Sequence, residues 1–131
     1  MKKLLVLLAF LLLPLTLSAG ESQERFWFCR QNGNVGDNLT MAITGVWADN
    51  YPNHYDERER AFEQHVLEVT EDAFVPSFQA KCREYVDESN AEKHREVEIK
   101  TAQRYNANVL ELQWRWTPDV GEGKRRDAEG P

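Results

Sequence analysis

The chain has 131 residues, of which 41% are hydrophobic and 29% are charged. Sixteen lysines and arginines stand against 22 aspartates and glutamates, so the formal net charge is −6 at pH 7. This acidic balance argues against a nucleic-acid or anionic-membrane surface, because both need clustered Lys and Arg to neutralise phosphates. A chain of this length accommodates one small domain with a modest core.

The first twenty residues have the pattern of a secretory signal peptide. Lys2 and Lys3 precede an apolar run over residues 4–17, and three small residues follow at 18–20. We expect cleavage after Gly20, with cleavage after Ala19 as the alternative. The apolar run is shorter than the roughly 18 residues of a membrane span, so no membrane anchor should remain. The pattern predicts a secreted or periplasmic protein that retains 14 basic and 22 acidic residues, a net charge of −8.

Two cysteines, Cys29 and Cys82, follow the predicted signal peptide. An even count in an exported protein predicts one disulfide between them. A catalytic thiol is the alternative, but it would leave the second cysteine unpaired and would itself oxidise outside the cell.

Alternating apolar and polar residues predict four strands, at residues 25–31, 39–48, 77–85 and 109–116. In the second strand, the alternation places Ile43 and Trp47 on one face, with Gly45 between them as a candidate bulge. In the third strand, it groups Phe78 with Ala80 and Cys82. The fourth strand has the cleanest separation of apolar and polar positions; its apolar face carries Leu110, Leu112, Trp114 and Trp116.

Two helices are predicted between these strands. Residues 56–70 carry Phe62, Val66 and Val69 at helical spacing, and acidic residues in the first turn suit the helix dipole. Residues 90–105 follow Ser89, which opens a capping-box pattern.

The order strand, strand, helix, strand, helix, strand predicts an α+β fold. We expect two layers, in which a mixed four-stranded sheet carries both helices on one face, each within a right-handed crossover. The predicted organisation is a signal peptide (1–20), one exported domain (21–116) and a disordered tail (117–131), since the tail offers almost nothing to bury.

No catalytic, metal-binding or cofactor-binding motif is present. The histidines His54, His65 and His94 lack the spacing of paired metal ligands, and no serine lies in a nucleophile elbow. The many carboxylates of the first helix alternate with arginines, which is typical of a solvated helix face. We therefore expect no metal and no cofactor.

The most suggestive stretch joins the second strand to the first helix. It interleaves aromatic and polar side chains, a combination that binds sugars and extended peptides. The competing interpretation is a linker in which Trp47 and Tyr55 fasten the helix to the core. The candidate binding residues are Trp47, Asp49, Tyr51, His54 and Tyr55.

Three functional hypotheses follow. The first is a small disulfide-bonded binding module with a protein or glycan partner, for which an inhibitor or immunity-type protein that masks a basic partner best fits the charge. The second is an extracytoplasmic hydrolase that uses His54, or His65 with His94, beside a carboxylate. The third is a structural component of the cell envelope. We expect a binding protein rather than an enzyme.

Overall fold

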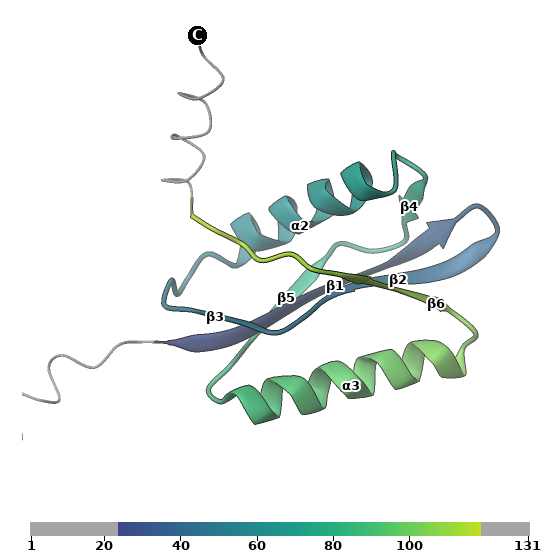
Figure 1. The fold of residues 1–131 in the computed structure, drawn as a ribbon. Helices are drawn as coiled ribbons and strands as arrows, with labels where there is room; N and C mark the ends of the chain where they lie inside the picture. Colours follow the sequence, from purple (N-terminus) through teal and green to yellow (C-terminus); the bar gives the residue numbers. More distant parts are fainter. Residues whose placement is uncertain (1–23, 119–131) are drawn as a thin grey trace, which may run out of the picture.

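The computed structural model describes residues 24–118 of the chain. The predicted signal peptide and residues 119–131 of the predicted tail lie outside this range. The described part forms a curled sheet flanked by two helices (Figure 1). Its elements are β1 (Arg25–Val35), β2 (Asn38–Thr44), β3 (Trp47–Asp49), α2 (Tyr55–Val69), β4 (Phe74–Pro76), β5 (Lys81–Tyr85), α3 (Glu88–Arg104) and β6 (Asn108–Leu112).

The long strand β1 organises the sheet. One side of β1 pairs antiparallel with β2 and β3, and its other side pairs antiparallel with β4 and β5. Strand β6 lies parallel to β2 at the other edge. The α+β class, the mixed sheet, the strand–helix–strand order and the two helices are thus confirmed, but the sheet of the described residues has six strands instead of the four expected.

A bulge separates β2 from β3 and reverses the face of the second predicted strand. Arg30 of β1 lies opposite Ile43, whereas Trp27, three residues earlier, lies opposite Trp47, four residues beyond Ile43. One extra residue on the β2–β3 side sends Trp47 to the face opposite Ile43. The candidate bulge at Gly45 is therefore present, but Trp47 and Ile43 do not share a face as the alternation predicted.

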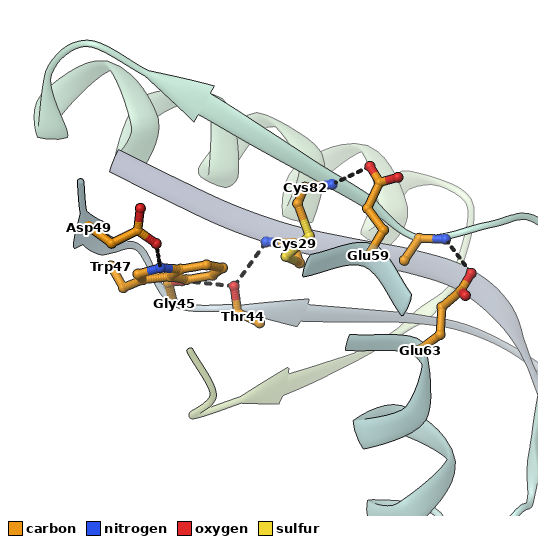
Figure 2. The surroundings of a disulfide bond; sticks show 9 residues. Cys29, Thr44, Gly45, Trp47, Asp49, Glu59, Glu63 and Cys82 are labelled. Atoms are coloured by element: carbon orange, nitrogen blue, oxygen red, sulfur yellow. Dashed lines mark hydrogen bonds between the residues drawn. A yellow bond between two sulfur atoms is a disulfide. The ribbon is translucent and has the colours of Figure 1, made fainter. Parts of the chain in front are cut away.

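The Thr44 hydroxyl replaces a ladder hydrogen bond at this bulge. Its oxygen accepts from the Cys29 backbone N–H at 3.0 Å and donates to the Gly45 carbonyl at 2.8 Å (Figure 2). Thr44 is fully buried.

The helices lie on opposite faces of the sheet, which corrects the expectation of a two-layer fold (Figure 1). Helix α2 contributes Phe62 and Val66 to a core with Trp27, whereas α3 contributes Ile99 to a core with Phe28. The physical reason is the direction of the two crossovers. The chain passes from β2 over β1 to β5 and then returns across the sheet to β6, so two right-handed connections have to use opposite faces.

The predicted disulfide is present. Cys29 of β1 and Cys82 of β5 are directly opposite each other, with their Cα atoms 4.0 Å apart, and both side chains are buried. A disulfide is typical of an oxidising, extracytoplasmic compartment.

Carboxylates of α2 cover the outer edge of the β5 region. Glu59 Oε2 accepts from the Cys82 N–H at 3.0 Å, and Glu63 Oε2 accepts from the Ala80 N–H at 2.9 Å (Figure 2). An uncovered strand edge is a template for pairing with other chains, so these contacts protect the sheet. The interpretation of the α2 carboxylates as a solvated face is wrong for Glu59 and Glu63.

Several predicted boundaries also differ. Strand β4 was not expected, and Phe78 beyond it is 71% exposed instead of lying beside buried Ala80 and Cys82. Helix α3 begins earlier than predicted, because the Asp87 carboxylate caps it by accepting from the Asn90 N–H at 2.8 Å. The fourth predicted strand divides into β6 and an extended segment, the C-terminal arm (residues 113–118).

Candidate functional site

Arg58, in the first turns of α2, is the centre of the most unusual cluster in the described chain. Its side chain is fully buried, and its guanidinium carbon lies 3.5 Å from the ring centre of Trp27 and 4.5 Å from that of Trp116. A guanidinium between two indole rings is favourable because each ring presents its negative face to the cation. Arg58 Nε and Nη1 have no hydrogen-bond partner among the described residues, so the rings replace water at this side of the group.

Asp49 at the end of β3 neutralises this buried charge. Its Oδ1 accepts from Arg58 Nη2 at 2.8 Å, and the carboxylate also accepts from Trp47 Nε1 and from the Tyr51 N–H. Burial lowers the pKa of Arg58, and the charge of Asp49 and the hydrogen bond to it act in the opposite direction. Arg58 Nη2 also donates to the Tyr51 carbonyl at 2.5 Å. The loop between β3 and α2 is thus held from both ends.

All four tryptophans of the protein gather on this face of the sheet. Trp114 of the C-terminal arm lies edge-on to Trp47, with ring centres 5.8 Å apart, and packs on Phe62 of α2. Trp116, two residues further, covers Arg58. Strand β1, the bulged β3 and the C-terminal arm therefore meet over α2 from three distant parts of the sequence.

The structure brings the five candidate binding residues together around Arg58, but it divides them into two groups. Trp47 and Asp49 are 7% and 8% exposed, so they lie beneath the surface of the cluster instead of forming it. Tyr51 and Tyr55 are 43% and 42% exposed, and His54 is partly exposed. The fastening role considered for Trp47 agrees with its burial, and Tyr55 likewise packs edge-on against Trp27 with ring centres 5.2 Å apart.

The surface residues are held by specific contacts. The Tyr55 hydroxyl donates to Glu84 at 2.8 Å; this hydrogen bond, together with desolvation and the Glu84 charge, raises the pKa of Tyr55. His54 Nδ1 lies 3.1 Å from Glu57 Oε1, and its ring lies 5.3 Å from Trp116. These contacts restrict the side chains of Tyr55 and His54.

Two of the hollows that adjoin the cluster share Glu57 and Arg60. The larger, here called the arm groove, has a volume of about 660 Å³ and lies between α2 and the C-terminal arm. Its lining residues are Glu57, Arg60, Ala61, Gln64, His65, Glu68, Trp114, Arg115, Trp116 and Thr117. The smaller, of about 420 Å³, surrounds the start of α2 and is lined by Asn53, His54, Tyr55, Asp56, Glu57 and Arg60.

The histidines do not converge. His65 stacks on Trp114 on the α2 face, whereas His94 stacks on Tyr85 on the α3 face, so the sheet separates them. The hydrolase arrangement of His65 with His94 is therefore not formed, and among residues 24–118 only His54 of the three histidines has a carboxylate in contact. Within residues 24–118, no three His, Cys, Asp or Glu side chains are placed to hold a metal ion.

Sequence reasoning missed Arg58, which it assigned to a solvated helix face. A weak signal was present, because Arg58 precedes Phe62 and Val66 by four and eight residues and so shares the apolar stripe of α2. It also did not connect Trp114 and Trp116 with the candidate stretch, since no pattern within one strand reports which distant loop it covers.

The comparisons with known proteins add no relative. No protein-family model, no curated protein and no solved structure matches this chain. Between residues 24 and 118, neither helix is long and apolar enough to cross a membrane.

Proposed function

We propose that this chain is a small, exported, disulfide-bonded binding protein that holds a partner protein on the surface around α2. The observation that carries the proposal is the cluster around Arg58. It keeps Tyr51, His54 and Tyr55 at the surface beside two hollows that share lining residues. Restrained aromatic side chains next to a groove are typical of the anchors of protein interfaces.

Export rests on two independent features. The pattern of residues 1–20 is that of a signal peptide cleaved after Gly20, and the disulfide suits an oxidising compartment. The charge of −8 expected after cleavage favours a basic partner, which opposite charge would bring in quickly.

The experiment captures partners of the oxidised chain from the envelope of the exporting cell and measures the affinity of the recovered protein. Replacing both Tyr51 and Tyr55 by Ala should weaken binding by about 30-fold or more, the loss typical of interface anchors. The matched control is Tyr105→Ala, because Tyr105 is 71% exposed at the end of α3, away from the cluster. Equal affinities for the double variant and the control would contradict the proposal. Failure to capture any stoichiometric partner would favour a structural envelope component.

A hydrolase is the second candidate, and one observation favours it. His54 and Glu57 form a histidine–carboxylate contact of 3.1 Å at the rim of the smaller hollow. Such a pair can act as a general base on a water molecule. Turnover of peptide or cell-wall substrates that disappears in a folded His54→Ala variant would establish this function in place of binding.

A further inference from the structure

The C-terminal arm has backbone groups that nothing in the described chain satisfies. No N–H or carbonyl of residues 114–117 makes a hydrogen bond with another residue of the 24–118 range. Within residues 24–118, the hydrogen bond that ties residues 114–117 to the rest of the chain comes from the Arg115 side chain, which donates to the Ala48 carbonyl at 3.0 Å. The arm is nevertheless extended, and the side chains of Trp114 and Trp116 anchor it to the core. It therefore presents a backbone segment whose N–H and carbonyl groups are unpaired among the described residues.

The arm groove lies between this segment and α2. The α2 residues that line it recur at three- and four-residue spacing from Glu57 to Glu68, so they form one face of the helix. Eleven residues of helix rise about 16 Å, which matches an extended peptide of about five residues. The groove thus has the length for a short extended strand beside the arm.

Negative groups gather near the Glu68 end of the groove, whose lining also contains Arg60 and Arg115. Glu71 and Asp72 follow the helix, the last turn of α2 has no basic residue, and the helix dipole places its negative end here. None of these three exposed carboxylates forms an ion pair within the described residues. At the other end, Arg60 accompanies Glu57. A cation is therefore favoured at the Glu68 end of the groove.

We propose that the partner inserts an extended peptide segment into the arm groove, where its backbone pairs with residues 114–117 and a Lys or Arg side chain meets Glu68. This inference rests on the proposed function and specifies the partner's chemistry. Backbone pairing supplies affinity in such strand additions, and side-chain contacts supply specificity. Pro118 ends the stretch available for pairing, because proline has no N–H to donate.

The probe is a random 12-residue peptide library displayed on phage and selected on the oxidised chain. The library is counter-selected on a Gln64→Trp variant, in which an indole on the exposed Gln64 fills the groove. Selected peptides should share a Lys or Arg. A synthetic copy of the best peptide should lose at least tenfold in affinity on Glu68→Lys, but less than twofold on Glu92→Lys, an exposed position on α3.

Backbone methylation of the peptide tests the pairing without altering the protein. Successive N–H groups of an extended strand point to opposite sides, so only every second N–H can pair with the arm. Methylating the nitrogens of that set should abolish binding, whereas methylating the alternate set should leave binding unchanged. The inference would be overturned if methylation of the two sets of nitrogens had equal effects, or if the selected peptides bound the Gln64→Trp variant equally well. Binding of glycan fragments instead of peptides would also overturn it. Capture of a protein that requires Tyr51 and Tyr55 but tolerates Gln64→Trp would overturn it and leave the proposed function standing.

Discussion

Replacing Asp49 by Asn tests whether the buried charge pair holds the candidate site together. The Asp49 and Arg58 side chains are 3% and 0% exposed, and a 2.8 Å contact joins them. The amide keeps the shape of the carboxylate but removes its charge, so Arg58 becomes a buried cation without a counterion. The amide can also accept fewer hydrogen bonds than the carboxylate, which receives N–H groups from Trp47 and Tyr51 as well.

The expected loss is large. Removing one partner of a buried ion pair costs about 3–5 kcal/mol, against a total stability of about 5–15 kcal/mol for a typical domain. At about 4–8 °C per kcal/mol for a domain of this size, the thermal midpoint should fall by at least about 12 °C. Urea unfolding followed by tryptophan fluorescence measures the free energy directly, and all four reporters surround the pair.

Two controls give this experiment its meaning. Glu96→Gln breaks a pair with Lys100 that is more than 60% exposed on both sides, and should change stability by less than about 0.5 kcal/mol. Combining Asp49→Asn with Arg58→Met removes both members, so the double variant should be more stable than Asp49→Asn alone. A loss below about 1 kcal/mol for Asp49→Asn, or a double variant with the summed losses of both single variants, would refute the reasoning.

Three further predictions concern the surroundings of the site. The pKa of Tyr55 is raised above its ordinary value of 10.0, so its neutral form stabilises the fold below pH 10. This contribution is lost as the pH rises through the raised pKa. In ultraviolet titration, Tyr55 should therefore ionise at a lower pH in the Glu84→Gln variant than in the unmodified protein. Glu59→Ala should cost about 1.5–3 kcal/mol and speed hydrogen exchange at the Cys82 amide, whereas unchanged exchange would deny the contact. Replacing Cys29 and Cys82 by Ala should lower the free energy of unfolding in urea by about 4 kcal/mol, because the disulfide spans 53 positions of sequence. Equal stabilities would show that the disulfide does not stabilise the fold.

The fold was partly predictable because its signals are local. Alternation located the first two strands and most of the last, and the spacing of Phe62 and Val66 located α2. The even cysteine count predicted the disulfide without reference to geometry. A single extra residue at the bulge was enough to defeat alternation beyond it, since side chains in a strand change face at every position.

The candidate site was predictable in part for the same reason. Tyr51, His54 and Tyr55 lie close together in sequence, so their proximity to one another followed from the chain itself. The roles of Arg58 and Trp116 did not, because an arginine on a charged helix has the same pattern whether water or two indole rings surround it. Glu59 and Glu63 were misinterpreted in the same way, as their backbone partners come from another part of the chain.

The sequence by itself determined the α+β class, the pairing of the cysteines and the neighbourhood of the exposed aromatic residues. The class depends on the periodicity of apolar residues, the pairing on the even number of cysteines, and the neighbourhood on the closeness of the aromatic residues in the sequence. Only the tertiary structure decided that the helices cover opposite faces, that Arg58 is buried with Asp49, and that the C-terminal arm forms a groove with α2. Periodicity shows which residues of one element share a face, but the element that covers this face is chosen by crossover direction and long-range packing.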